Sequence, residues 1–356
     1  MAATIALARG WPAPECLPVA ELADCARSVL ERDGRTILSY GPSSGYGPLR
    51  EWAADRHGVD PKRVFLTNGS LQGFVFLAQQ LAPGKRVLVE RPTYDRPLKL
   101  LREFGAEVVL VDCDDEGLDP DALEAALGSG EKPAFIYLIP TFQNPSGRTL
   151  PEDRRRRVVE LALAHDVLVL EDDPYGLVRF DGEPLPSLFE LSDGATAYSS
   201  SFSKTIAPGL RVGWFVLPEK LASELEATAT STYITPVQLG QATVFEFLQR
   251  GLFEPNLERV RGLLGARRDA MLAALERELP DVRTSRPDGG YFLWAELNGV
   301  DASDLQTRAE AAGVTFVKGV DFGGEPNSLR LAYSFVSPEE IAEGVARLAA
   351  ALPTAV

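Results

Sequence analysis

Lys204 is one of seven lysines in this 356-residue chain, and it stands in the stretch SSSFSKTIAPGLRVGW, residues 199–214. Small and hydroxyl-bearing residues surround it, and Arg211 follows seven positions later. A lysine that is shielded from water has a lowered pKa and becomes a better nucleophile, for example toward an aldehyde. Such chemistry would require the amine to be held in place beside groups that bind an anion.

Three further motifs carry polar side chains that suit such a site. Asn144 stands in TFQNPSG, and EDDPYG contains Asp172 and Tyr175. TNGSLQG (67–73) places small residues before a helix that opens at Ser70, where free N–H groups and the helix dipole favour an anion. Each motif also has an ordinary structural explanation, because an Asn-Pro pair is typical of a turn, an aspartate can cap a loop, and TNGS can cap a helix.

The segments that carry these motifs alternate between strands and helices. Predicted strands, mostly apolar on both faces, occupy 86–90, 107–112, 134–140, 167–172, 196–202 and 211–217. Helical patterns separate several of them, at 71–82, 93–105, 119–128 and 151–166. The alternation predicts an α/β fold in which helices enclose a mainly parallel mixed sheet. Ligands of such sheets bind beyond the carboxyl ends of the strands, which is where Asn144, Asp172 and Lys204 fall.

Together, these groups predict a binding site for pyridoxal phosphate. The aldehyde of this cofactor needs an amine, and its pyridine nitrogen needs a carboxylate that keeps the ring protonated as an electron sink. Its phenolic oxygen needs donors such as tyrosine and asparagine. Its phosphate needs helix N–H groups, hydroxyls and an arginine.

Over essentially its whole length, the sequence resembles the pyridoxal-phosphate-dependent aminotransferases of fold type I, class I/II. It is most similar to the 2-aminoadipate aminotransferases, a group that also supplies the catalytic half of MocR-type regulators. The matching motifs are YGPSSGYGPLR, LTNGSLQG, ERPTY, PTFQNPSG, EDDPYG, SFSKTIAPGLRVGW, DGGYFLW and SLRLAYS. The resemblance implies an aspartate-aminotransferase-like fold. It also implies ping-pong transfer of an amino group from an L-amino acid to a 2-oxo acid, with 2-oxoglutarate the expected acceptor.

The resemblance assigns roles to single residues, with Lys204, Asp172 and Tyr175 as the catalytic set. Lys204 would form the Schiff base with the cofactor and then move a proton, and Asp172 would pair with the pyridine nitrogen. Tyr175 and Asn144 would bond the phenolic oxygen, and Tyr94 would stack on the ring. The phosphate would be bound by Ser70, Leu71, Gln72, Ser201, Ser203 and Arg211.

Substrate and subunit contacts follow from the same resemblance. Arg330 would bind the substrate α-carboxylate bidentately, with Asn144 and Gly10 bordering the substrate. Tyr40 matches a tyrosine that reaches the phosphate of a neighbouring subunit, which implies an obligate homodimer with shared active sites. The residues around Arg330 support its role independently, because apolar neighbours in SLRLAYS (328–334) do not suit a fully solvated arginine. A structural ion pair is the alternative.

The pattern changes after about residue 218. Long helices are predicted at 218–232, 236–250 and 255–279, then strands at 291–297 and 328–334, and a last helix from Pro338. We therefore expect an N-terminal segment (1–30) that joins the small domain, a large cofactor-binding domain (31–250) and a small α+β domain (251–356). Four successive arginines at 154–157 would fan around a helix, which predicts a solvated face.

Composition excludes several other classes of protein. A net charge of −15 argues against nucleic acid or anionic lipid as a partner. No apolar run approaches the ~18 residues of a membrane span, and the N-terminus is a poor secretion signal. Three cysteines without metal-ligand spacing and two histidines predict no metal site and a reduced, cytoplasmic protein.

Three alternatives were weighed against an aminotransferase. Ser201 to Lys204 satisfies S-x-x-K, the nucleophile motif of penicillin-binding proteins, but the SDN and KTG motifs of that class are missing. A non-enzymatic MocR-type effector domain would follow a winged-helix domain, for which the chain has no room. A specialised lyase, decarboxylase or cyclase on the same fold stays open, because the same lysine and aspartate serve all carbanion chemistry.

The N-terminal segment is expected to form the pocket for the substrate side chain. The chain begins a few residues before GWPAP, so we expect the N-terminal arm to be short or missing. The candidate wall is segment 7–20 with help from Tyr40 and the helix expected near 17–30. Trp11 and Leu17 would make this wall apolar, and Arg9 could pair with a distal carboxylate. We expect a broad pocket that accepts long or aromatic side chains alongside glutamate.

Overall fold

The large sheet consists of strands that are mostly buried on both faces. The computed structural model describes residues 4–353, and all six predicted strands are present in it with ends shifted by no more than two residues. In spatial order the sheet contains β2 (Val64–Thr67), β9 (Gly213–Val216), β8 (Ala197–Ser201), β7 (Leu168–Asp172), β6 (Phe135–Leu138), β3 (Arg86–Arg91), β4 (Glu107–Asp114) and β5 (Gly117–Leu118). The two outer strands β2 and β5, four and two residues long, were not predicted from the sequence.

The strand directions confirm the mainly parallel mixed sheet. Strands β4, β3, β6, β7 and β8 run parallel to one another, and β9 runs antiparallel to both β8 and β2. The carboxyl ends of β6, β7 and β8 therefore meet at one edge, which is where the motifs with Asn144, Asp172 and Lys204 begin.

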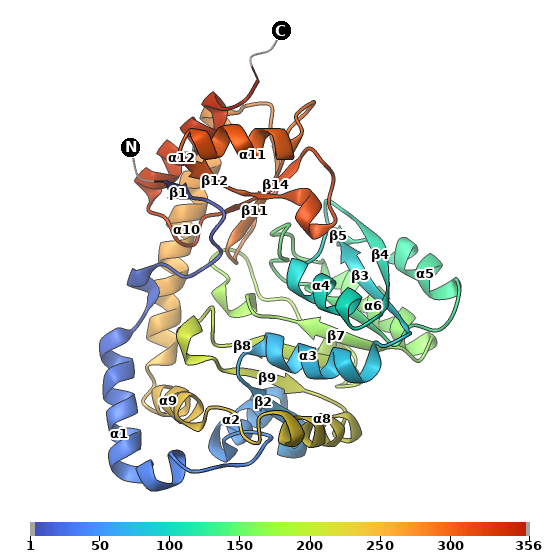
Figure 1. Ribbon diagram of the computed structural model, residues 1–356, viewed down its shortest axis with the longest axis vertical. Helices are drawn as coiled ribbons and strands as arrows, with labels where there is room; N and C mark the ends of the chain where they lie inside the picture. The colour runs from blue at the N-terminus through green and yellow to red at the C-terminus, as the bar shows by residue number, and fades with distance from the viewer. Residues whose placement is uncertain (1–3, 354–356) are drawn as a thin grey trace.

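Helices cover both faces of this sheet (Figure 1). Val87 and Val89 pack toward α3, α4 and α8, while Leu88 between them packs toward α5 and α6, as the two-residue period of a strand requires. The helices of this part of the chain are α2 (Gly47–His57), α3 (Ser70–Leu81), α4 (Asp95–Glu103), α5 (Pro120–Gly128), α6 (Glu152–Ala164), α7 (Leu188–Leu191), α8 (Glu219–Thr232) and α9 (Gln238–Gln249).

A second, smaller sheet lies above the edge that carries the motifs (Figure 1). It contains the antiparallel strands β10 (Arg283–Thr284), β11 (Phe292–Glu296), β14 (Ser328–Ala332) and β13 (Val317–Lys318), and beside it β1 (Ile5–Ala6) pairs with β12 (Val314–Thr315). The helices here are α10 (Phe253–Glu278), α11 (Ala302–Ala311) and α12 (Pro338–Ala350), while α1 (Val19–Ile37) packs on α9. The helix α10 runs alongside both sheets (Figure 1). The domain boundaries at residues 30 and 250 stay a prediction.

Short 3-10 turns complete the connections between these elements. They are η1 (Pro14–Cys16), η2 (Pro61–Arg63), η3 (Gly176–Val178), η4 (Pro208–Leu210) and η5 (Gly319–Phe322). None of the helices in residues 4–353 combines the length and the apolar character needed to cross a bilayer.

The predicted solvated face of arginines on α6 is wrong for Arg155. Its side chain is buried and donates to the backbone oxygens of Leu150 (2.8 Å) and Pro140 (2.9 Å), and to Thr141 Oγ1 (2.8 Å). These oxygens belong to the two ends of the loop that carries Asn144. A helix places one side of its circumference against the sheet, so one member of a four-residue run must face inward. Arg155 therefore holds a loop of the site in place.

Candidate active site

A cavity of about 680 Å³ opens at the carboxyl edge of the large sheet, beneath the smaller sheet. It brings together most of the residues predicted from the sequence: Gly10, Ser70, Leu71, Tyr94, Asn144, Asp172, Tyr175, Ser201, Ser203, Lys204, Arg211 and Arg330. Gln72 and Tyr40 do not line it. The side chain of Gln72 turns back to accept from the backbone N–H of Asn68 at 3.0 Å, and Tyr40 is 78% exposed on the surface.

Lys204 follows β8 and points into this cavity. Its Nζ donates to the backbone oxygen of Gly10 at 3.0 Å and lies 5.1 Å from the ring centre of Tyr291. Burial, together with the smaller effects of the charges on Arg330 and Arg211, lowers the pKa of Lys204 from its ordinary 10.5 to about 8. Roughly a tenth of the amine is therefore uncharged at pH 7, far more than for an ordinary lysine, and the uncharged amine is the nucleophilic form.

Asp172 is the last residue of β7 and offers the cavity an acceptor without a partner. The hydroxyl of Tyr137 donates to Asp172 Oδ2 at 2.7 Å, while Oδ1 is buried and has no hydrogen-bond partner within residues 4–353. Burial raises the pKa of Asp172 to about 6, and the hydrogen bond from Tyr137 opposes this rise. A cationic N–H facing Oδ1 would satisfy this atom and keep the carboxylate charged.

Asp173 points to the other side of the strand. One of its oxygens accepts from the backbone N–H of Gly176 at 2.7 Å, and the other accepts from the hydroxyl of Tyr198 at 3.0 Å. Adjacent carboxylates on a strand point in opposite directions, so only Asp172 presents a free oxygen to the cavity.

The start of α3 and the segment after β8 form a concave anion site. Arg211 adopts a left-handed backbone conformation (φ 54°), and its guanidinium lies 3.4 Å from Ser203 Oγ and donates to the backbone oxygen of Asn68 at 3.1 Å. Gly69 has φ 87°, and a Cβ there would overlap that guanidinium. A Cβ on Gly213 would likewise overlap the backbone N of Ser70. The backbone is thus kept bare where helix N–H groups and an arginine converge, which is the arrangement that binds phosphate.

Arg330 enters the cavity from β14 of the smaller sheet. It donates to Asn144 Oδ1 at 2.8 Å and to the backbone oxygen of Ala8 at 3.0 Å, and its Nε is buried without a partner. The rings of Phe292 and Phe322 lie 4.1 and 4.8 Å from its guanidinium carbon. Burial lowers the pKa of Arg330 to about 10. No ion pair to Arg330 exists within residues 4–353, so the structural ion pair considered from the sequence is not present there.

Two tyrosines complete the walls of the cavity. Tyr94 directly precedes α4, and burial raises its pKa to about 12. Tyr175 is buried, burial raises its pKa, and its ring lies 5.5 Å from that of Tyr291. Both phenols therefore stay protonated and can donate hydrogen bonds.

Tyr137, Phe292 and Tyr291 also belong to the site, although no role was predicted for them from the sequence. Tyr291 donates to the backbone oxygen of Lys204 at 2.9 Å, and Phe292 covers Arg330. Tyr137 lies in the apolar run of β6, where its spacing resembles that of a core residue. Only the register between β6 and β7, in which Tyr137 pairs with Leu170, brings its hydroxyl near Asp172.

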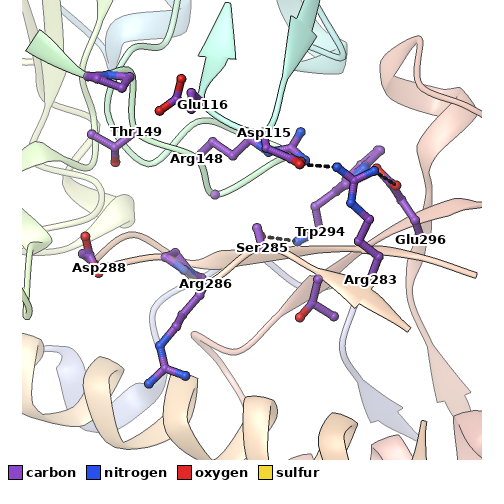
Figure 2. A pocket seen from close by; sticks show the side chains of 14 residues that line it. Asp115, Glu116, Arg148, Thr149, Arg283, Ser285, Arg286, Asp288, Trp294 and Glu296 are labelled. Atoms are coloured by element: carbon purple, nitrogen blue, oxygen red, sulfur yellow. Dashed lines mark hydrogen bonds and ion pairs between the residues drawn. The ribbon is translucent and has the colours of Figure 1, made fainter. Parts of the chain in front are cut away.

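A second cavity of about 410 Å³ is lined by Asp115 and Glu116, residues 147–149 and 283–288, and Trp294 and Glu296 of β11 (Figure 2). Several of its charged groups pair with one another: Asp115 pairs with Arg148 at 2.7 Å and with Arg283, and Arg283 also lies 3.3 Å from Glu296. Arg286 is exposed, and the residues that line this cavity contain no buried side-chain nitrogen or oxygen without a partner within residues 4–353, in contrast to Asp172 and Arg330 in the first cavity. Residues 4–353 also contain no group of three or more His, Cys, Asp or Glu side chains placed to hold a metal ion.

The residues of the first cavity fit pyridoxal phosphate. The unpaired Oδ1 of Asp172 matches a protonated pyridine nitrogen, Lys204 supplies an amine of lowered pKa, and the bare backbone beside Arg211 matches a phosphate. Such a constellation at the carboxyl edge of this sheet defines the pyridoxal-phosphate-dependent enzymes of fold type I.

Residues 13–348 match the family model of Aminotransferase class I and II, and the chain belongs to this family. It is 42% identical to a 2-aminoadipate transaminase of Thermus thermophilus, over 98% of this chain and 90% of that protein. It is also 36% identical to aromatic-amino-acid aminotransferase 1 of Thermococcus litoralis, over 97% of this chain and 87% of that protein. The chain is accordingly a pyridoxal-phosphate-dependent aminotransferase.

Solved structures agree over nearly the whole chain. The α-aminoadipate aminotransferase of Thermus thermophilus, complexed with N-(5'-phosphopyridoxyl)-L-leucine, superposes with a TM-score of 0.93 at 39% identity, covering 98% of this chain and 92% of that one. The kynurenine aminotransferase of Pyrococcus horikoshii superposes with a TM-score of 0.94 at 35% identity, covering 99% and 91%. The predicted aspartate-aminotransferase-like fold and the predicted cofactor are both confirmed.

Proposed function

We propose that this enzyme transfers the amino group of an L-amino acid to 2-oxoglutarate in a ping-pong cycle. The observation that carries the proposal is the pair formed by Arg330 and Lys204 in one cavity. Arg330 is a buried guanidinium whose partners are a neutral amide and a backbone oxygen rather than a carboxylate, and Lys204 is an amine of lowered pKa. A substrate α-carboxylate would supply the missing negative charge at Arg330 and set its α-carbon near Lys204.

The roles of the chain's own groups follow from their positions. When bound, pyridoxal phosphate supplies an electron sink for the charge left at the substrate α-carbon. Asp172 would hold a proton on the pyridine nitrogen, and Lys204 would take the proton from the α-carbon and deliver it to the former aldehyde carbon of the cofactor. Asn144 accepts from Arg330 with its Oδ1, which leaves its Nδ2 free to donate to the phenolic oxygen beside Tyr175. Tyr94 would pack on the ring.

The side chains and helix N–H groups predicted to bind the phosphate lie together at one end of the cavity. Ser203 and Arg211 contact each other, and Ser201 donates to Ser203 at 2.8 Å, so these side chains already form one polar cluster. At the helix start, we assign binding to the N–H groups of Ser70 and Leu71. The N–H of Gln72 already donates to the backbone oxygen of Gly69 at 3.1 Å, so we assign no phosphate contact to it.

A homodimer is part of the same proposal. Exposed apolar side chains gather in two adjoining segments: Leu38 (72% exposed) and Tyr40 (78%) in one, Ile234 (52%) and Val237 (54%) in the other. Hydrogen bonds join these segments, and the N–H of Val237 donates to the side chain of Asn68, next to the phosphate site. A second copy on this surface would bring Tyr40 toward the partner's phosphate site.

We place the enzyme in the cytoplasm, a proposal that the three free cysteines support.

The two half-reactions test the proposal. The loaded enzyme is mixed with one L-amino acid at a time, and the visible absorption of the cofactor is followed. An amino donor should bleach this absorption, 2-oxoglutarate should restore it, and glutamate should be recovered. A lyase or decarboxylase would instead release product continuously without a 2-oxo acid. The variant Lys204→Ala should stay folded and lose turnover; near-normal transamination by this variant would refute the assignment of Lys204.

A further inference from the structure

Arg9 is a cation at the mouth of the active-site cavity that has no acidic partner. It lines the cavity, and within residues 4–353 its side chain makes no hydrogen bond and no ion pair. The aromatic rings of Trp11 and Phe335 lie 4.8 and 4.7 Å from its guanidinium carbon. Such contacts attract a guanidinium through the ring faces and leave its N–H groups available to an anion.

The other charged groups of the cavity already have partners or assigned ligands. Arg211 belongs to the phosphate site, Asp172 to the pyridine nitrogen and Arg330 to the substrate α-carboxylate. Arg96 lies beside Asp95, with 3.5 Å between Nε and Oδ2. Arg9 is therefore the cation that no part of the cofactor and no α-carboxylate accounts for.

The backbone on either side of Arg9 touches the reacting centre. The oxygen of Ala8 accepts from Arg330 at 3.0 Å, and the oxygen of Gly10 accepts from Lys204 at 3.0 Å. A substrate that replaces Ala8 on Arg330 would lie against this segment, and its side chain would extend past residue 9. Gly10 cannot carry a side chain, because a Cβ would overlap the ring of Phe292, so Arg9 and Trp11 are the side chains this segment can present there.

We propose that Arg9 binds the distal carboxylate of dicarboxylic substrates, both the 2-oxo acid acceptor and the matching amino donor. The proposal rests on the proposed function, since a ping-pong enzyme must bind both substrates in one site. A guanidinium can bind a carboxylate with two parallel hydrogen bonds. When the substrate side chain is apolar, Arg9 remains on its aromatic neighbours and Trp11 offers an apolar surface. One segment thus serves both dicarboxylic and apolar substrates.

The test compares glutarate with pentanoate as ligands of the loaded enzyme. The two acids have the same carbon chain and differ by one carboxylate, and their binding is read from the change in cofactor absorption, so no turnover is needed. The wild-type enzyme should prefer glutarate. In Arg9→Gln this preference should fall roughly 10- to 100-fold, as expected for the loss of a charge-assisted hydrogen-bonded pair. Arg9→Lys should lie between the two, because it keeps the charge but not the two-pronged geometry.

A control variant separates contact from general electrostatics. Arg96→Gln removes one positive charge near the same mouth and should change the preference much less than Arg9→Gln does. Any of three results would overturn the proposal. The preference could change equally in both variants, it could stay unchanged in Arg9→Gln, or Arg9→Gln could lose the same affinity for both acids. Failure of transamination would show instead as a wild-type enzyme that binds glutarate but never bleaches with an amino donor, so the two failures are distinguishable.

Discussion

The hydroxyl of Tyr137 donates to Oδ2 of Asp172 at 2.7 Å, and this bond decides which oxygen of the carboxylate faces the cofactor site. The other oxygen, Oδ1, is buried and unpaired within residues 4–353. Burial raises the pKa of Asp172 to about 6, and the hydrogen bond lowers it. Tyr137 therefore acts on the cofactor through Asp172, by keeping that carboxylate oriented and ionised.

Tyr137→Phe should weaken cofactor binding without unfolding the protein. Oδ2 would lose its donor, and the pKa of Asp172 would rise further because its charged form is less stabilised. Losing a hydrogen bond to a charged group costs about 1.5 kcal/mol or more, which is roughly tenfold in affinity. Titration of the cofactor-free variant with pyridoxal phosphate at several pH values measures this, and the pH at which affinity declines should move upward. An unchanged affinity and pH profile would show that Tyr137 is only a core residue.

Asp172→Asn should bind the cofactor and lose several orders of magnitude in turnover. An amide cannot hold the proton on the pyridine nitrogen, so the negative charge at the α-carbon loses its sink. Asp173→Asn is the matched control, because Asp173 uses both oxygens within the protein and should affect stability more than rate. Single-turnover kinetics and thermal unfolding of both variants give the answer. An inactive Asp173→Asn beside an active Asp172→Asn would show that the assignment is reversed.

The pKa of Lys204 gives the native protein a pH-dependent stability. Its pKa is lowered from 10.5 to about 8, so between these values the unfolded chain holds a proton that the native cofactor-free protein does not. Raising the pH through this window therefore stabilises the native state, by up to about 3 kcal/mol. The unfolding free energies of the cofactor-free wild type and Lys204→Met, measured from pH 7 to pH 10, should converge as the pH rises. A constant difference would mean that the pKa is not lowered.

The sequence predicts the edge of the sheet where the site lies, because strand order and the carboxyl-end rule need only local patterns. Asp172 could be preferred to Asp173 from strand alternation, and the unpaired Oδ1 is consistent with that choice. Tyr137 and Arg155 could not be identified in this way. Both depend on register and helix rotation, which tertiary packing sets. In a local pattern, a tyrosine inside an apolar strand is typical of the core, and an arginine in a run of four is typical of the surface.

Arg155→Met should destabilise the fold strongly. The buried guanidinium donates to backbone oxygens of Pro140, Leu150 and Pro186, and the last two would lose this donor, while Pro140 keeps the N–H of Leu150. A buried acceptor without a partner costs about 1–3 kcal/mol, so the total should reach several kcal/mol. Urea unfolding measures the loss. Arg156→Met is the control: Arg156 is exposed, and its pair with Glu152 should contribute about 0.5 kcal/mol or less. Similar losses in the two variants would contradict the role of Arg155.

The last prediction concerns the surface formed by Leu38, Tyr40, Ile234 and Val237. If a second copy covers it, Leu38→Asp would bury a charge in the interface and should weaken the dimer about 100-fold or more. Light scattering over a dilution series measures the dimer. Cofactor affinity should fall with it, because Tyr40 of the neighbouring copy could no longer reach the phosphate site. Leu163→Asp is the matched control, since Leu163 is an apolar side chain on α6 that is 55% exposed and outside this surface. A Leu38→Asp protein that stays dimeric, or a fully active monomer, would refute the shared site.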